Sequence, residues 1–542
     1  MARPSSSPAN SLRERCAAIA DEEATLREGG GKAGQERQHK HGRLFVRERI
    51  EQLLDKDAPF FELGLWAAYK MYEQWGKIPA AGAVAGIGNV AGIPCLIIAN
   101  DATVKAGAFF PATAKKLIRA QRIGFECNLP IIYLVDSAGV FLPMQDEIFP
   151  DEDDFGRIFR NNSVISAAGI PQFAAIMGNC VAGGAYLPVL CDKILMTECS
   201  GLYLAGPSLV KAAIGEIIEQ EDLGGATMHA EISGTVDFHE KDDESCLKRI
   251  RALVALLPEA EAAKKAPKPE KFKAAQPADA VYDIVSLDGQ KPYDARDLLA
   301  SIIDADSLDE YKADYGKTLV TAYARIGGRP VGIVASQRQQ ARTKKEGIQM
   351  GGVIYHDSAD KAARFVMDCN QTGIPIIFFQ DVTGFMVGGA AEQSGIIRSG
   401  AKLVNAVSNS TVPKITVVVG GSFGAGNYAL CGKAYDPRFI LAWPHARYAV
   451  MGAAQASDTV FSVLARARDR GDKKSTPEEL EELRAQVKAS YEEQTDIRYG
   501  AARGWVDAVI QPEETRDVLI RLLSYVSRPT PKARFHTGVV QV

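Results

Sequence analysis

PIIYLVDSAG, residues 130–139, and PIIFFQDVTG, residues 375–384, are two versions of one pattern: an apolar run that ends in an aspartate and a glycine. A second pair follows each of them, since PQFAAIMGNCVAGGAY begins at Pro171 and PKITVVVGGSFGAGNY begins at Pro413. Insertions or deletions inside either copy would break this common spacing. The pattern therefore predicts an internal duplication into two structurally equivalent domains.

The spacing also agrees residue by residue within the two copies. Asp136 lies six positions past its proline, and so does Asp381. The other equivalent pairs are Gly139 and Gly384, Gly178 and Gly420, and Tyr186 and Tyr428. Each copy runs a buried strand into a glycine turn, which is how a fold presents bare backbone N–H groups to a ligand.

Composition narrows the class of protein. A chain of 542 residues with 46% hydrophobic and 24% charged residues is typical of a globular protein of several domains. A net charge of -4 gives no footprint for nucleic acid or for an anionic membrane, so we expect neither as a partner. The nine cysteines form no C-x-x-C pair, which suits buried, reduced thiols. The expected location is the bacterial cytoplasm, or the mitochondrial matrix if the protein is eukaryotic.

Before these paired strings in each half, strands and helices alternate. Residues 90–100 predict a strand pair and residues 114–128 a helix, and the second half repeats both at 324–336 and 352–366. The expected fold class is α/β with stacked sheets. An Ala-, Lys- and Pro-rich stretch follows residue 258 and reads as a linker. The predicted organisation is an N-terminal domain over 1–258, a linker over 259–279 and a C-terminal domain over 280–542.

Two further stretches are expected to be helical. Residues 11–55 carry apolar stripes, and the Gly29-Gly30-Gly31 run inside them is interpreted as a helix terminator, because no strand precedes it. Thr476 and Glu479 form a capping-box pattern that opens a charged helix near the C-terminus.

The glycine turns are the candidate catalytic sites. Gly183 and Gly184 follow one buried strand, and Gly424, Ala425 and Gly426 follow the equivalent strand. A turn between a strand and a helix leaves amide N–H groups without partners, and such groups can stabilise an oxyanion. The alternative is a tight turn that needs glycine for steric reasons alone. Two equivalent turns favour a reaction with two substrates.

Other patterns compete with this hypothesis. Ser422 stands in a G-x-S-x-G string between a strand and a helix, which fits a serine hydrolase, with His445 and His536 as the downstream histidines. The equivalent of Ser422 in the first copy is Cys180, which argues against it. His39 and His41 flank a lysine in a polar stretch, and without converging ligands we expect no metal site.

Longer motifs run through both halves in a fixed order. They are NDATVKAGAFFPATAKK (100–116), YLVDSAGVFLPMQDEIFPDEDDFGRIF (133–159), CVAGGAYLP (180–188), TGFMVG (383–388), SGAKLV (399–404), VPKITVVVGGSFGAGNYALCGKAYDPRF (412–439) and WPHARYAVMG (443–452). Over roughly residues 15–525 the chain resembles the carboxyltransferase (β) subunits of biotin-dependent acyl-CoA carboxylases. GGSFGAGNY and WPHARYAVMG are most similar to the methylcrotonoyl-CoA carboxylase branch, which belongs to leucine degradation.

The resemblance implies a fold and partners. The fold would be two tandem crotonase/Clp-protease-like domains, with the N-terminal domain of one protomer facing the C-terminal domain of another. The partners would be further copies in a β hexamer, and an α subunit that holds the biotin carboxylase and the biotin carrier. Biotin would stay on that partner, an acyl-CoA thioester would be the substrate, and nothing would be bound covalently to this chain.

The resemblance also implies roles for residues. Amides of Gly183 and Gly184 would hold the acyl thioester oxygen, and amides of Ala425 and Gly426 the ureido oxygen of biotin. Phe423, Gly424 and Tyr428 would complete the biotin site. The acyl-CoA would further meet Lys105, Ala106, Gly107, Ala138 and Gly139, and also Tyr311 and Thr318 in a segment (308–337) that resembles one assigned to acyl-CoA binding.

Two departures leave the substrate open. Lys105-Ala106-Gly107 stands where Lys-Gly-Gly is usual in the methylcrotonoyl branch, and Ser137-Ala138-Gly139 where Ser-Gly-Gly is. A propionyl-, geranyl- or other acyl-CoA carboxylase therefore remains an alternative, as does a glutaconyl-CoA decarboxylase-type carboxyltransferase. The chain has neither an A-M-K-M-type biotin site nor an ATP-binding loop, so we expect one subunit of a larger enzyme.

Overall fold

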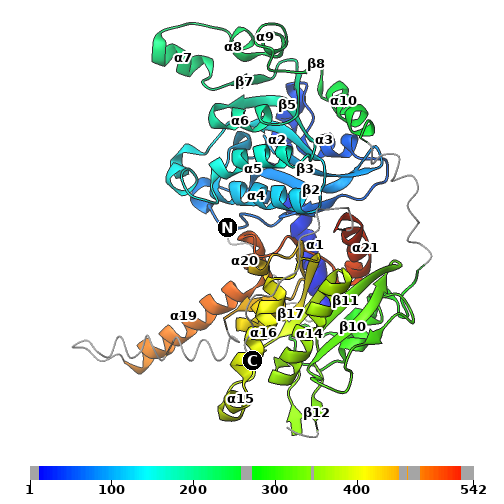
Figure 1. Cartoon of the computed structure of the whole chain (residues 1–542). Coiled ribbons are helices and arrows are strands. Elements are labelled where there is room, and N and C mark those ends of the chain that lie inside the picture. The colour runs from blue at the N-terminus through cyan, green and yellow to red at the C-terminus, as the bar shows by residue number, and fades with distance from the viewer. Residues whose placement is uncertain (1–10, 258–271, 344–346, 451–460, 462–475, 527–542) are drawn as a thin grey trace.

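The computed structural model describes residues 11–257, 272–343, 347–450, 461 and 476–526. Figure 1 shows two lobes, the N-terminal one in blue to green and the C-terminal one in green to red. An eight-stranded sheet forms the centre of each lobe. The predicted linker (259–279) begins outside the described residues, and its described end, from residue 272, is hydrogen-bonded to the C-terminal lobe, where the amide of Gln276 donates to Ala300 O at 3.0 Å.

The two sheets have the same topology, which confirms the predicted α/β duplication. The order β1-β2-β3-β4-β5-β6-β8, with β7 beside β5, corresponds to β9-β10-β11-β15-β17-β18-β20, with β19 beside β17. The N-terminal strands are β1 (Phe61–Leu63), β2 (Ala83–Val90), β3 (Ile93–Asn100), β4 (Ile131–Ser137), β5 (Gln172–Val181), β6 (Lys193–Thr197), β7 (Gly201–Tyr203) and β8 (Phe238–Glu240). The C-terminal strands are β9 (Asp309–Glu310), β10 (Leu319–Ile326), β11 (Arg329–Ser336), β15 (Ile376–Val382), β17 (Lys414–Phe423), β18 (Phe439–Ala442), β19 (Arg447–Ala449) and β20 (Ala508–Val509).

Even an irregularity is duplicated. β4 and β5 pair in parallel with a register shift before Ser137 meets Cys180, and β15 and β17 shift in the same way before Val382 meets Ser422. β4 and β15 are buried along their whole length, as expected for parallel strands covered on both faces. Small two-stranded sheets join β12 (Ala341–Thr343) to β13 (Gly347–Gln349) and β14 (Val353–Ile354) to β16 (Gly384–Phe385).

The helices cover the sheets and follow the predicted stretches. Residues 11–55 form three helices, the first of which ends at Arg27, just before the glycine run. Thr476 caps the charged helix α19 through the predicted box with Glu479. In the N-terminal half the helices are α1 (Leu12–Arg27), α2 (Lys32–Lys40), α3 (Val46–Leu53), α4 (Pro111–Glu126), α5 (Phe155–Ala167), α6 (Tyr186–Val189), α7 (Pro207–Ile214), α8 (Gln220–Gly224), α9 (Ala226–Glu231) and α10 (Asp243–Ala255). The C-terminal half has α12 (Val281–Ile284), α13 (Ala295–Leu299), α14 (His356–Thr372), α15 (Gly389–Gln393), α16 (Ile396–Ser408), α17 (Gly424–Ala429), α19 (Pro477–Thr495), α20 (Ile497–Ala502) and α21 (Thr515–Val526).

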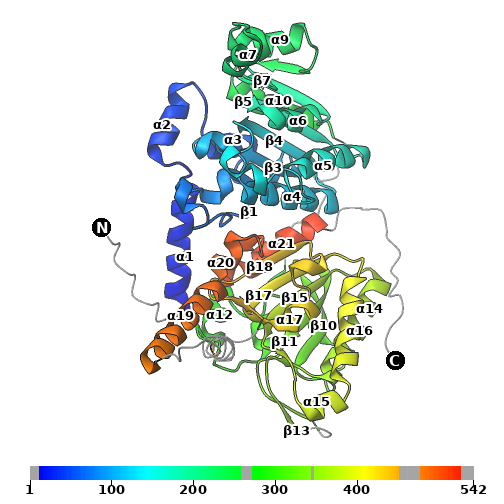
Figure 2. The ribbon, with the colours of Figure 1, turned by 90° about the vertical axis from the view of Figure 1, so that its left-hand side faces the viewer.

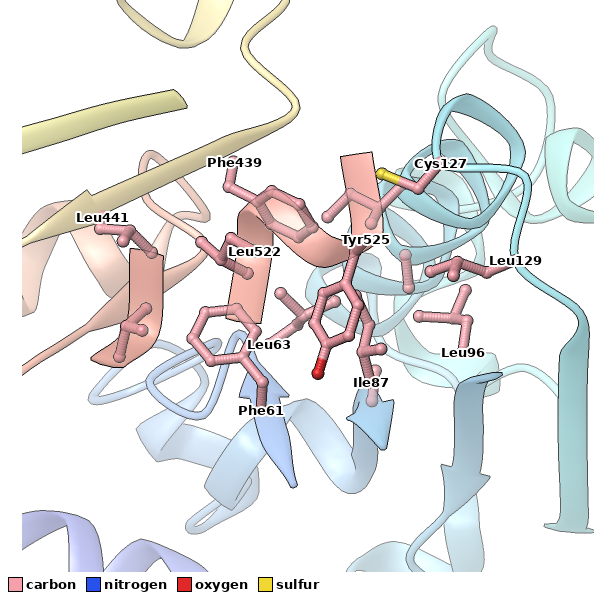
Figure 3. Packing of buried hydrophobic residues seen from close by; sticks show 14 of the residues in the cluster. Phe61, Leu63, Ile87, Leu96, Cys127, Leu129, Phe439, Leu441, Leu522 and Tyr525 are labelled. Carbon is pink, nitrogen blue, oxygen red and sulfur yellow. The ribbon is translucent and has the colours of Figure 1, made fainter. Parts of the chain in front are cut away.

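An apolar core joins the lobes. Figure 3 shows Leu522 and Tyr525 of α21 beside Phe61 of β1 and Phe439 of β18, and the rings of Phe61 and Phe439 meet edge to face at 6.1 Å. In Figure 2, α1 runs along the side of the molecule from one lobe toward the other. The sequence placed this helix in the N-terminal domain, but its Arg15 pairs with Asp496 of the C-terminal lobe at 2.8 Å.

Seven of the nine cysteines are buried, as predicted, whereas Cys191 is half-buried and Cys199 is exposed; all nine are free. Burial raises the pKa of the Cys180 thiol to about 12, so this side chain stays protonated at neutral pH. Within the part of the chain that is described, no helix combines the length and the apolarity needed to cross a bilayer.

Candidate active site

The C-terminal turn joins β17 to α17. Gly424 begins the helix with φ +54°, a left-handed conformation that favours glycine, and Phe423 offers no side-chain cap to the first helical turn. The first amides of a helix have no acceptor within it, so those of Ala425 and Gly426 are available to a ligand. Ala425 is exposed, and the half-exposed Tyr428 ring packs against Tyr435 beside it.

The N-terminal turn is built in the same way. Ala182, at the position equivalent to Gly424, also has a positive φ, +56°. A Cβ atom at Gly184 would lie 3.8 Å from the Cα of Gly139, and the equivalent atom at Gly426 would lie 3.4 Å from the Cα of Gly384. In each lobe the glycine turn after the long strand therefore lies against a glycine that stands two residues after the end of the neighbouring strand, β4 or β15.

The helix after the N-terminal turn is short. A 3-10 turn, η5 (Ala182–Ala185), leads directly into α6, which spans only four residues. The chain must enter β6 at once, because the amide of Asp192 already donates to Gln172 O at 3.0 Å. Gly183 and Gly184 thus sit in a tight turn rather than in a full helix.

The structure brings the predicted acyl loop to this turn. Lys105, Ala106 and Gly107 are consecutive residues with φ of +48°, +54° and +67°. A side chain at Gly107 would come within 2.1 Å of Asp136 O, and the amide of Ala138 donates to Ala106 O at 3.0 Å. Left-handed residues other than glycine cost about 1–3 kcal/mol each and gather at functional sites. Lys105–Gly107, Ala138 and Gly139 and the η5 turn therefore form one locus.

Tyr311 and Thr318 lie elsewhere. Both belong to the C-terminal lobe, where the Tyr311 ring packs against Phe365 of α14. Thr318 is buried, and its hydroxyl lies 2.9 Å from Ser358 Oγ of the same helix. Their place in the connection between β9 and β10 of the second lobe separates them from the acyl loop of the first.

The environment of Ser422 does not suit a nucleophile. Its buried hydroxyl donates to Gln380 Oε1 at 2.6 Å and accepts from Asn427 Nδ2 at 2.7 Å. Neither ring nitrogen of His445 has a hydrogen-bond partner in the described residues, and burial lowers the pKa of His445 to about 4. His536 lies outside the described residues. A catalytic serine needs a base that accepts its proton, whereas here the proton goes to an amide oxygen.

The structure also shows polar residues around the turns that sequence reasoning missed. They are Arg49, Arg338, Gln380 and Asn427. Gln380 and Asn427 join β15 to α17 through Ser422. Asp136 and Asp381, which the arginines contact, stood out in the repeat, but the arginines come from non-equivalent positions and leave no spacing signal.

Two sheets of one topology, each with an amide-lined turn at the end of its long central strand, define a tandem crotonase-type α/β protein. Residues 37–536 match the family described as carboxyl transferase domain. The chain belongs to this family.

Relatives of known name are similar in sequence to nearly the whole chain. It is 44% identical over 497 residues to the biotin-dependent 3-methylcrotonyl-coenzyme A carboxylase beta1 subunit of Mycobacterium tuberculosis, covering 92% of this chain and 91% of the relative. It is 43% identical over 500 residues to the mitochondrial methylcrotonoyl-CoA carboxylase beta chain of Dictyostelium discoideum, covering 92% and 82%. The crystal structure of the geranyl-CoA carboxylase beta subunit of Pseudomonas aeruginosa superposes with a TM-score of 0.83 at 33% identity, over 100% of both chains.

Proposed function

We propose that this chain is the carboxyltransferase (β) subunit of a biotin-dependent acyl-CoA carboxylase, with a methylcrotonoyl-like acyl-CoA as its substrate. The observation that carries this proposal is the occurrence of one amide-lined turn twice in a chain whose relatives are biotin-dependent carboxylases. A transfer between two carbonyl compounds needs two sites for a developing negative oxygen, and the duplication supplies one in each lobe.

The residues divide the reaction between the lobes. When bound, carboxybiotin from the partner subunit would supply the carboxyl group and a basic ureido nitrogen to take the proton of the acyl-CoA. Amides of Gly183 and Gly184 stabilise the enolate oxygen that forms on the thioester, while amides of Ala425 and Gly426 hold the ureido oxygen. The donor set fits a urea, because neutral amide N–H groups can donate to its oxygen and stabilise the negative charge that develops there. This chain contributes positioning and electrostatic stabilisation and uses no side-chain base.

The partners follow from the placement of the site. The acyl loop is on one lobe and Tyr311 is on the other, so we propose that the N-terminal domain of one copy faces the C-terminal domain of a second within a homohexamer. Exposed apolar side chains on both lobes support such contacts, among them Leu142 and Ile217 on the first and Val387 and Ile397 on the second. Biotin arrives on an α subunit. The compartment would be the bacterial cytoplasm, or the mitochondrial matrix in a eukaryote; the Dictyostelium relative is named as mitochondrial.

The test is acyl-CoA-dependent fixation of labelled bicarbonate by the chain together with its cognate biotin subunit and ATP. We expect methylcrotonoyl-CoA to give the highest kcat/KM. The extra methyl groups of Ala106 and Ala138 narrow the acyl locus, and one methylene in a fitted pocket is worth about 10- to 200-fold. Geranyl-CoA is therefore expected to be poorer by at least about 10-fold. Carboxylation of the biotin subunit without transfer to any acyl-CoA would contradict the proposed function. Activity only in decarboxylation would place the chain with the decarboxylase-type enzymes.

A further inference from the structure

We propose that Asp136 and Asp381 are positioning residues, each holding the strand end that leads into one of the two amide-lined turns. The inference rests on the proposed function, which assigns the first turn to the acyl-CoA and the second to biotin. It goes beyond that function because neither aspartate lies in the substrate-binding set.

The Asp136 carboxylate packs against the backbone of β5 just before the N-terminal turn. Asp136 is the last residue but one of β4, it is buried, and its Oδ1 accepts from the amide of Asn179 on β5 at 3.3 Å. Gly178 permits this approach, because a Cβ atom there would lie 2.1 Å from Asp136 Cγ. The carboxylate therefore packs directly on the β5 backbone, four residues before Ala182 begins the turn.

Asp381 does the same in the C-terminal lobe. Its Oδ1 accepts from the amide of Gly421 at 2.9 Å, and a Cβ atom at Gly420 would lie 2.5 Å from that oxygen. Its Oδ2 accepts from the Tyr293 hydroxyl at 3.1 Å. Gly421 is three residues before Gly424, so this contact too is made just before the turn.

A different arginine neutralises each carboxylate. Arg49 of α3 is 2% exposed. Its Nη1 lies 3.4 Å from Asp136 Oδ2 and its Nη2 donates to Met177 O at 2.9 Å, so it contacts both β4 and β5. Arg338, just after β11, lies 3.3 Å from Asp381. Non-equivalent positions thus supply a cation to equivalent aspartates, so the feature that the two lobes share is the carboxylate. Burial raises the pKa of both aspartates, and the arginines oppose this shift.

The same aspartates also touch the neighbouring loops through their backbone. Asp136 O is the atom that a side chain at Gly107 would meet at 2.1 Å, and Asp381 O would lie 3.3 Å from a Cβ atom at the equivalent Gly352. Asp136 therefore sets the β5 end and the acyl loop relative to each other. A misplacement of about 1 Å at a catalytic group can cost about 100-fold in rate. The paired arginine keeps net negative charge away from an oxygen that must itself become negative.

The test compares Asp136→Asn with Asp381→Asn in the assembled enzyme. Asparagine keeps the shape and one acceptor oxygen but removes the ion pair. In the transfer assay, the KM for acyl-CoA and the KM for the biotin carrier are measured separately. We expect Asp136→Asn to lower kcat by about 10- to 100-fold and to raise only the acyl-CoA KM, and Asp381→Asn to raise only the carrier KM. Tyr293→Phe, which removes one donor to Asp381, should shift the carrier KM in the same direction by less.

The matched control is Asp243→Asn. This residue is equally buried and pairs with the same Arg49 at 2.8 Å, but its other contact is the amide of Leu44, away from β5. It should lower the melting temperature without changing either KM. The inference is overturned if both test variants lose activity only in proportion to their melting temperatures, with both KM values unchanged, and equally if neither loses activity. A failure of the proposed function would show separately, as a wild-type enzyme that transfers nothing to an acyl-CoA.

Discussion

Ala425→Val and Gly184→Val should each lower the rate of acyl-CoA carboxylation by about 100- to 1,000-fold, the loss that follows when an oxyanion site is disabled. Ala425 is exposed at the start of α17, so two added methyl groups enter the site without disturbing the core. At Gly184 a Cβ atom has 3.8 Å of clearance to Gly139, so the first carbon fits and the valine methyl groups fill the space where the thioester would lie. Carboxylation of the biotin subunit itself, measured in parallel, should be unaffected.

Ala485→Val is the control for these variants. Ala485 is also an exposed alanine in a helix, α19, which contributes no residue to either turn, so activity should stay within about twofold of the wild type. Wild-type activity in both Ala425→Val and Gly184→Val, with both proteins assembled normally, would show that the reaction does not take place at these turns.

Asp507→Ala should give the largest loss of stability, about 3–5 kcal/mol, because it removes the buried carboxylate that two part-buried cations share. Asp507 is 3% exposed, and its two oxygens receive Arg119 at 2.9 and 2.7 Å and Lys433 at 2.8 Å. Arg119 belongs to α4 of the first lobe, so this cluster joins the lobes. Urea unfolding at pH 7 measures the loss.

The pH dependence of this cluster has a definite sign. Arg119 and Lys433 hold the pKa of Asp507 far below its ordinary value, against the effect of burial. A lowered carboxyl pKa contributes stability above the unfolded-state pKa, about 3.9, and that stability is lost as pH falls through the folded-state pKa. The difference between wild type and Asp507→Ala should therefore be complete at pH 7 and shrink below about pH 4. Asp279→Ala is the control, since its pair with Arg13 is more than half exposed at 3.5 Å and should be worth less than about 1 kcal/mol. Equal unfolding midpoints for wild type and Asp507→Ala would contradict the role of the cluster.

Most of the fold could be predicted from the internal repeat in the sequence. Equal spacing predicted the duplication, and the structure extends it to the register shifts before Ser137 and Val382. The places of Gly184 and Ala425 followed from the same spacing. Both are local features of one strand and the turn after it, which sequence patterns describe well.

What the sequence could not predict depends on contacts between distant residues. Arg49 and Arg338 reach the equivalent aspartates from α3 and from the end of β11, and no spacing relates them. The string around Ser422 fits a nucleophile pattern, and only Gln380, far away in sequence, shows that the hydroxyl is structural. α1 reaches the second lobe through the ion pair between Arg15 and Asp496, which composition does not reveal.

The most direct test is a structure of the assembled enzyme with an acyl-CoA and the biotin carrier bound. We predict that an amide of Gly183 or Gly184 lies about 2.7–3.1 Å from the thioester oxygen, and that an amide of Ala425 or Gly426 of the facing copy lies equally close to the ureido oxygen. A thioester oxygen held by side chains elsewhere, with both glycine turns facing solvent, would contradict the claim that backbone amides on the two lobes carry out the transfer.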